Sequence, residues 1–299
     1  MKIIDIISFF VIILIVFGFS SCKKEFEYDT EYNKKIVVSS VLMPDSSVYV
    51  LLTYAYPPDK AHPDSIIKGI SGAYVELLDD QGNRAVLQEI SDYWINGFNL
   101  WYVTSPVYFT DSLKPVPGHR YTLKVFVNGY DTIRAQTTVP YSPLVDSVAC
   151  NISTDPDLND GYHFIYDFSF FLRDTIPGRN YFYVFNSDNL GKQLTSDDPS
   201  KEFEFYGVLF SDRLFNLSSY KLTFRYFYEY SSHIPERKIY FYQVNDDFSR
   251  FLYSAIAQIP PELPNPFMEP SIVYSNVING YGIFCAISRP YIINISSKK

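Results

Sequence analysis

The sequence predicts an all-β fold, mainly strands with one or two helices, organised as two successive β-rich domains of the sandwich type. Short runs of β-branched and aromatic residues recur along the chain, turn-forming Gly, Pro, Asp and Asn residues separate them, and apolar residues alternate with polar ones inside the runs. This spacing is typical of β-sandwiches. With 299 residues, of which 47% are apolar, the chain is long enough for one to two domains with buried cores.

The first predicted domain covers residues 32–140. A turn at Pro44-Asp45-Ser46 separates its first two strands, and a turn at residues 79–83 separates the next two. Odd-numbered residues from Tyr121 to Val127 form one apolar face, as a half-buried strand requires. The predicted strands of this domain are residues 36–42, 47–54, 73–78, 85–90, 121–127 and 133–139.

The second predicted domain, residues 141–299, is rich in aromatic residues. Of the 54 aromatic residues of the chain, 27 lie between positions 162 and 253, so we expect a core of large flat rings there. Apolar residues alternate from Phe164 to Leu172 and again from Leu222 to Tyr230, which predicts two long strands.

One helix is predicted in this second domain, near residues 246–257. Apolar residues recur there at helical spacing, from Phe248 to Ile256. Asn245 or Asp246 precedes them as a candidate N-cap, and two prolines follow the segment and end it.

Residues 1–21 have the layout of a secretory signal peptide, with an apolar run from Ile6 to Phe17 and small residues before Cys22. The run is too short for a membrane-spanning helix, which needs about 20 residues. A cleaved signal without lipid is the remaining alternative. We expect Cys22 to be acylated, and residues 22–31 to form a tether that attaches the chain to the lipid bilayer.

The net charge limits the classes of partner, and the cysteine content limits the disulfides that the chain can form. The formal net charge is -8 at pH 7, and an acidic surface is repelled by nucleic acid, so no nucleic-acid partner is expected. Besides Cys22 the chain has Cys150 and Cys285, and strand parity predicts that both point into a core. In an oxidising compartment they form either two buried thiols or one disulfide, and both alternatives stay open.

No catalytic residue, metal ligand or cofactor is predicted. The four histidines are far apart in sequence, and no nucleophile elbow, phosphate-binding loop or dinucleotide-binding glycine pattern occurs. The acidic run from Asp155 to Gly161 begins like a calcium loop, but its glycine comes one position late and Tyr166 takes the place of the bidentate glutamate. An acidic turn between strands is the favoured interpretation. We therefore expect a non-enzymatic protein.

A ladder of rings on one predicted strand is the first candidate ligand-binding group. Tyr226, Tyr228 and Tyr230 share one face of that strand, and exposed rings in such an arrangement can stack on a sugar or a peptide. Most stripes of this kind belong to a sandwich core, which is the favoured interpretation here.

A second candidate group is Trp94, Phe98 and Trp101. These rings lie in a stretch interrupted by polar residues, which predicts a loop or a ragged hairpin. Large rings in a loop are less easily explained by packing than rings on a strand. Binding and core packing are equally open for this group.

Several motifs of the chain occur in an order that resembles one family. They are the charged stretch after Cys22, Pro117-Gly118-x-x-Tyr121-Thr122-Leu123, Gly129-Tyr130, Thr137-Thr138-Val139-Pro140, Asn180-Tyr181-Phe182, Asn265-Pro266-Phe267-x-x-Pro270, Tyr274-Ser275-Asn276 and Gly280-Tyr281-Gly282-Ile283-Phe284. Together they resemble the domain of unknown function 4249 family, which comprises envelope lipoproteins of the Bacteroidota.

The resemblance implies an N-terminal Ig-like β-sandwich followed by a family-specific β-rich domain. It also implies an outer-membrane location, with the periplasmic or cell-surface face left open, and frequent association with TonB-dependent receptors. It implies no catalytic residues. The expected function is an accessory ligand-binding or docking partner of such a receptor in nutrient uptake. The alternative is a surface adhesion or structural spacer lipoprotein.

Overall fold

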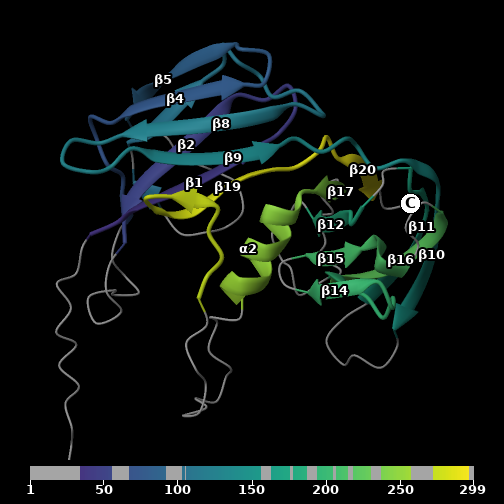
Figure 1. The fold of residues 1–299 in the computed structure, drawn as a ribbon. Helices are drawn as coiled ribbons and strands as arrows, with labels where there is room; N and C mark the ends of the chain where they lie inside the picture. The colour runs from purple at the N-terminus through teal and green to yellow at the C-terminus, as the bar shows by residue number, and fades with distance from the viewer. Residues whose placement is uncertain are drawn as a thin grey trace, which may run out of the picture. The chain divides into compact units, whose positions relative to one another are not determined.

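The computed structural model describes residues 34–55, 67–91, 103–104, 106–155, 163–175, 178–186, 194–204, 207–214, 218–229, 237–256 and 272–295. Strands dominate these residues, and the strands form several sheets (Figure 1). This confirms the predicted mainly β, sandwich-like fold. Residues 34–299 cluster as one compact unit by their contacts.

The largest sheet contains most of the strands predicted in the first half of the chain. Its strands are β1 (Ile36–Leu42), β2 (Val48–Tyr54), β4 (Tyr74–Asp79), β5 (Arg84–Ile90), β7 (Val107–Thr110), β8 (Arg120–Phe126), β9 (Ile133–Thr138), β18 (Val277–Ile278) and β19 (Tyr281–Ala286). They lie in the order β18-β9-β8-β4-β5-β7-β2-β1-β19. Alternate residues of β1, β8 and β9 are buried, because one face of the sheet packs on a core.

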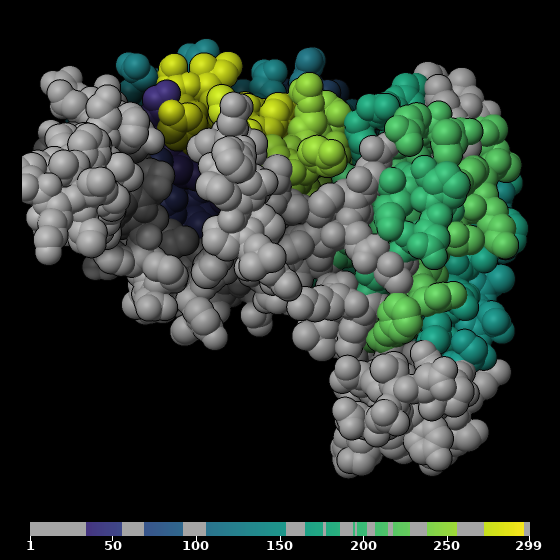
Figure 2. All heavy atoms as spheres, turned by 90° about the horizontal axis from the view of Figure 1, so that it is seen from below, coloured from purple at the N-terminus to yellow at the C-terminus, as the bar shows by residue number. Residues whose placement is uncertain are grey.

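The two strands at the ends of this order follow one another in the chain, and we call residues 277–286 the C-terminal hairpin, although each of its strands pairs with another strand of the sheet. β18 pairs antiparallel with β9, and β19 pairs parallel with β1. Figure 2 shows the yellow C-terminal atoms beside the purple atoms of the N-terminal strand. The hairpin therefore covers both edge strands of the sheet that residues 36–138 form.

This pairing crosses the domain boundary predicted at residue 140. The prediction assigned residues 277–286 to the second domain, whereas they complete the first sheet. A parallel pairing between segments more than 200 positions apart leaves no local sequence signal, because a turn cannot specify its register.

β19 is buried on both faces, so it contributes to two cores. Phe284 and Ala286 belong to the core of the large sheet. Ile283, Cys285 and Ile287 point the other way and pack in a second cluster with Tyr181, Tyr183, Leu209, Val244 and Phe248. A continuous apolar run is typical of a parallel strand covered on both sides.

Two asparagines hold the hairpin in place. The Nδ2 of Asn276 donates to the carbonyl oxygens of Phe284 (2.7 Å) and Gln136 (3.2 Å), and its Oδ1 accepts from the Phe284 amide (3.0 Å). Asn279 adopts a left-handed conformation with φ of 63°, and its Nδ2 donates to the carbonyl of Thr132 (3.0 Å). These bonds tie the hairpin to β9 and to the turn before it.

Gly282 is the position at which β19 comes closest to β1. It lies opposite Val38 in the register and has φ of 97°. A Cβ atom added there would lie 2.0 Å from the Val38 carbonyl oxygen. Glycine is therefore required both by backbone conformation and by space.

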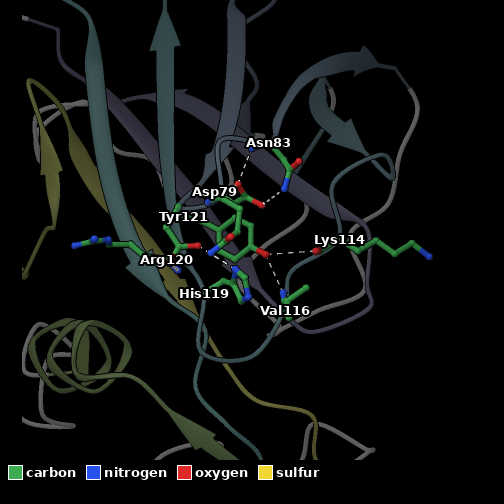
Figure 3. A network of polar contacts seen from close by, with 9 residues as sticks. Asp79, Asn83, Lys114, Val116, His119, Arg120 and Tyr121 are labelled. Carbon is green, nitrogen blue, oxygen red and sulfur yellow. Dashed lines mark hydrogen bonds and ion pairs between the residues drawn. The ribbon is translucent and has the colours of Figure 1, made fainter.

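A corner beside β8 explains another motif of the sequence (Figure 3). The Tyr121 hydroxyl accepts from the Val116 amide (2.9 Å) and lies 3.4 Å from the Lys114 carbonyl oxygen, so one buried ring holds the chain that leads into β8. Gly118 turns this segment with φ of 83°. Next to it, Asp79 accepts bonds from the amide and the side chain of Asn83 and shapes the β4–β5 turn.

Two more sheets form from the aromatic-rich part of the chain. The four-stranded sheet has the order β10-β11-β16-β13, with β10 (Val145–Asp155), β11 (His163–Arg173), β16 (Ser219–Glu229) and β13 (Leu194–Thr195). The five-stranded sheet has the order β14-β15-β12-β17-β20, with β14 (Lys201–Glu204), β15 (Val208–Ser211), β12 (Tyr181–Asn186), β17 (Arg237–Val244) and β20 (Tyr291–Ile295). A short 3-10 helix, η3, spans Asp212–Leu214.

Stacked and tilted rings fill the space between these two sheets. The ring centroid of Phe170 on β11 lies 4.7 Å from that of Phe241 on β17, and Phe241 lies 5.7 Å from Phe182 on β12. All three side chains are buried. Burial of such rings is the dominant apolar contribution to this core, as predicted.

Helix α2 (Asp246–Ile256) confirms the predicted helix, with Asn245 as its cap. The Oδ1 of Asn245 accepts from the Phe248 amide (3.0 Å), and its Nδ2 donates to the hydroxyl of Thr137 on β9 (2.6 Å). On the far side, the Tyr274 hydroxyl donates to Asp247 (2.6 Å). The helix is thus bonded to both β9 and the segment that leads into β18.

Gly282→Ala tests whether close approach of β19 to β1 is required. We expect the free energy of unfolding to fall by about 2 kcal/mol or more, since backbone strain alone costs roughly 1–3 kcal/mol and the Cβ also displaces the Val38 carbonyl. Urea titration followed by circular dichroism measures the change.

Gly72→Ala is the matched control for this substitution. Gly72 has φ of 76°, but an added Cβ would have no neighbour within 4 Å. It should cost less than Gly282→Ala, because it adds backbone strain without a clash. Equal losses for the two variants would contradict the close approach of β19 to β1.

Candidate functional site

Two long segments, residues 56–66 and 92–102, end at neighbouring points of the fold. They lie outside the described residues, but each is followed directly by a described strand, β3 (Ile67–Lys68) and β6 (Val103–Thr104). β3 and β6 pair in parallel, with Ile67 opposite Val103. The C-terminal ends of both segments are therefore held side by side.

The chain continues in close backbone contact after these two strands. A Cβ atom added to Gly69 would lie 2.2 Å from the carbonyl oxygen of Pro106. The Ile70 amide, one residue on, donates to the Leu52 carbonyl of β2 (2.8 Å). The chain that follows the two segments is thus bonded to the large sheet, and we call residues 67–73, 103–104 and 106–108 the loop base.

Glu89 and Tyr108 organise the loop base. The Glu89 carboxylate accepts from the Ser71 hydroxyl (2.6 Å) and the Gly72 amide (2.7 Å), and it lies 3.3 Å from the Tyr108 hydroxyl. That hydroxyl accepts from the Ala73 amide (2.8 Å) and donates to the Ile70 carbonyl (2.8 Å). Two side chains therefore satisfy the backbone polar groups that turn the chain into β4.

The surroundings shift the pKa of both groups in opposite directions. The Gly72 amide, followed by the Ser71 hydroxyl, lowers the pKa of the Glu89 carboxyl, because these bonds favour its charged form. The pKa of Tyr108 is raised to about 12, chiefly because the side chain is buried, so its hydroxyl stays protonated. A charged acceptor thus lies beside a neutral phenol, which is a stable structural arrangement.

Sequence reasoning missed Glu89 and Tyr108. Their partners lie 17 to 38 positions away, so no local motif joins them. The predicted binding residues Trp94, Phe98 and Trp101 fall in residues 92–102, outside the described residues. Their role stays a prediction, but the loop base fixes where their segment ends.

The ladder of tyrosines is a different case. Tyr226 is 0% exposed and lies in the aromatic core, with its ring 6.1 Å from that of Tyr166. The ligand-binding alternative is therefore wrong for Tyr226, because the five-stranded sheet covers this face of β16. The Tyr228 side chain and Tyr230 lie outside the described residues.

Cys150 and Cys285 are both free thiols, so the disulfide alternative is wrong. They belong to different sheets, Cys150 to β10 and Cys285 to β19. Cys285 is 1% exposed, as predicted, and burial raises the pKa of its thiol. Cys150 is exposed, contrary to the prediction, because β10 is an edge strand that the facing sheet leaves uncovered.

A buried polar cluster lies between β12 and β17. The amide and the Nδ2 of Asn180 donate to the Asp212 carboxylate (2.9 and 2.8 Å), and Asn180 Oδ1 accepts from Gln243 (3.0 Å). Burial raises the pKa of Asp212, while the Asn180 bonds oppose the shift. A hollow of about 20 Å³ beside Asp174 and Gln243 is large enough for one water molecule. These groups bond one another, so we assign the cluster a structural role.

The described residues contain no group of three or more His, Cys, Asp or Glu side chains that could hold a metal ion. Across the same residues, no helix has the length and apolar character needed to span a bilayer. We take the loop base as the candidate functional site because β3 and β6 pair there, directly after the two long segments.

Glu89→Gln tests the loop base through its pH dependence. The folded-state pKa of Glu89 is lowered, so its contribution to stability is complete above the unfolded value of about 4.3 and is lost as pH falls through the folded value. We expect a lower urea midpoint for the variant at neutral pH, and a gap that closes in acid. Asp111→Asn, which removes an exposed charge outside this network, should leave the midpoint unchanged. Similar effects of both variants, or a gap that widens in acid, would contradict the assignment.

Comparisons with known proteins place the chain in a family. Residues 23–290 match the family described as Domain of unknown function (DUF4249). A search of the curated proteins finds no match. Among solved structures the chain is similar to "Biofilm associated protein - BSP domain", with 6% identity, a TM-score of 0.22, and coverage of 72% of this chain and 57% of that one. A TM-score this low carries no argument about function. Because the family match spans most of the chain, this protein belongs to the DUF4249 family.

Proposed function

We propose that this protein is a non-enzymatic cell-envelope lipoprotein that docks on a TonB-dependent outer-membrane receptor and assists nutrient uptake. Trp94, Phe98 and Trp101, whose segment is followed directly by β6, are the candidate docking residues. The observation that carries the proposal is the parallel pairing of β3 with β6, which brings together the chain directly after residues 56–66 and 92–102. Cys22 would attach the chain to the outer membrane.

The loop base supports this assignment because it is built as a rigid support. Binding residues lie disproportionately on loops that a rigid scaffold positions. Here the scaffold is the large sheet, to which Ile70 and Tyr108 fasten the backbone. Trp94 and Trp101, the two tryptophans of the chain, both lie in residues 92–102, which precede β6 in the sequence. Tryptophan is among the residues most enriched at the energetic centres of protein interfaces.

The N-terminal sequence supports the location. Residues 1–21 have the layout of a signal peptide that ends at Cys22, and the compact unit begins at Lys34. The twelve residue-to-residue steps from Cys22 to Lys34 can span roughly 40 Å when extended, at about 3.4 Å per residue. A tether of this length would let the folded unit meet a partner embedded in the same membrane.

A pull-down of the tagged full chain from outer membranes tests the proposal. We expect a TonB-dependent receptor to co-purify with the wild type and to be lost with the double substitution Trp94→Ala and Trp101→Ala. The physical reason is the loss of two large apolar contacts, each of which can contribute more than about 2 kcal/mol at the centre of an interface. Quantitative mass spectrometry of the eluates measures the change.

Two further variants serve as controls. Phe171→Ala removes a ring that is 40% exposed on β11, away from the loop base in sequence and sheet, and should retain the receptor. Cys22→Ser should release the chain from the membrane fraction. Recovery of no receptor across growth conditions would contradict the proposal, and recovery of adhesion or matrix components instead would favour the spacer or adhesion alternative.

A further inference from the structure

β10 is an edge strand with one open side. It pairs with β11 over its whole length, and within the described residues the order of the sheet gives it no partner on the other side (Figure 1). Residues 149–153 are all exposed. An eleven-residue edge offers a long row of unpaired backbone donors and acceptors to another chain.

The centre of this edge lacks the features that usually block pairing. Edge strands are commonly protected by charged residues, prolines or bulges. Residues 147–153 read Ser-Val-Ala-Cys-Asn-Ile-Ser and contain no charge and no proline. The one register shift in the pairing with β11 lies before this stretch, between Val145 and Ser147.

One face of β10 is an uncovered extension of the aromatic core. Val148, Cys150 and Ile152 lie opposite Phe170, Phe168 and Tyr166 of β11, and opposed residues of an antiparallel pair share a face. The three β11 rings are buried, whereas Cys150 is exposed and Ile152 is 53% exposed. Val148 is half-buried against the core, and Cys150 and Ile152 continue the same face to the edge of the sheet as exposed side chains.

The sequence of the edge is complementary to itself in one antiparallel register. If Cys150 faces Cys150 of a second copy, then Val148 faces Ile152, Ser147 faces Ser153 and Ala149 faces Asn151. Val148 and Ile152 bring two apolar side chains together, Ser147 and Ser153 bring two small polar ones together, and no charges are opposed in this stretch. Cys150 is also the middle residue of Val145–Asp155, so this register centres the overlap on the strand.

We propose that β10 is a self-association edge, at which two copies of this chain pair antiparallel with both Cys150 residues on the two-fold axis. The pairing joins the two four-stranded sheets into one continuous sheet. Symmetric pairing of identical surfaces is the commonest way in which protein chains form dimers. The occupant of the edge is a second copy because the central register is self-complementary.

A disulfide between the two Cys150 residues would show that the strands pair in this register. Directly opposed residues of antiparallel strands have Cα atoms about 4.5 or 5.5 Å apart, which lies within the range of about 4.4–6.8 Å that a disulfide spans. A strand edge is a small contact area, so without a covalent link we expect a reversible dimer whose population rises with protein concentration.

The test begins with the full chain in mild detergent and oxidised glutathione as the oxidant. Two Cys150 thiols lose two protons and two electrons and form one S–S bond, while oxidised glutathione takes them up and becomes two glutathione thiols. We expect a covalent dimer on non-reducing gels, with the Cys150–Cys150 peptide identified by mass spectrometry. The same dimer, without the covalent bond, should appear by light scattering under reducing conditions as concentration rises.

Cysteines moved by one position test the register itself. In a Cys150→Ser background, Ala149→Cys and Asn151→Cys proteins should cross-link efficiently when mixed, because positions 149 and 151 are opposed. Each alone should cross-link poorly, since its two cysteines are then diagonal neighbours with Cα atoms about 7–8 Å apart, beyond disulfide reach.

Controls separate this pairing from other contacts. Ile152→Lys places two charges in the apolar centre of the dimer and should abolish cross-linking through Cys150, whereas Leu214→Lys adds the same charge at an exposed position of η3 and should not. A chain that stays monomeric at all concentrations, or one that cross-links equally well through 149 alone, 151 alone and the mixture, would overturn the proposal.

Discussion

The parallel pairing of β19 with β1 is the interaction on which the rest of the structure depends. Residues 36–138 alone would form a sheet with two open edges, β1 and β9, and the C-terminal hairpin covers both. β19 also places alternate side chains in two cores, Phe284 in one and Cys285 in the other. Gly282 permits this because only glycine allows the backbone to approach Val38 so closely. The two halves of the chain are therefore parts of one cooperative unit.

The positions of the family motifs in the fold explain why they contain these residues. Asn276 and Gly282 hold the hairpin, Tyr121 holds the corner before β8, and Asn180 lies at the centre of a buried polar cluster. Each of these residues satisfies backbone groups or allows a close approach. The motifs thus preserve a scaffold. The loop base and the edge of β10 are the two places at which we propose that this scaffold contacts a partner.

Local patterns predicted much of the fold, and long-range pairing limited the rest. An alternating apolar face identified β8, and runs of β-branched residues bounded by turn residues identified β1 and β9. Helical spacing with Asn245 identified α2, because all these signals arise from neighbouring residues. Strand parity placed Cys150 on the core side of β10, but parity does not tell whether a facing sheet reaches an edge strand. The same limit hid the pairing of β18 with β9, the pairing of β19 with β1 and the partners of Glu89. For Tyr226 the sequence left a core role and a binding role open, with the core role favoured. The facing sheet buries its side chain and so decides for the core role.

Hydrogen–deuterium exchange of the intact chain in increasing urea tests the central claim most directly. If the hairpin joins both halves into one unit, the amides of β1, β9 and β19 should open together, with the same free energy of opening and the same dependence on urea. Protection that persists in β1 and β9 after β19 has opened would show that the first sheet is stable without the hairpin, and would contradict the account.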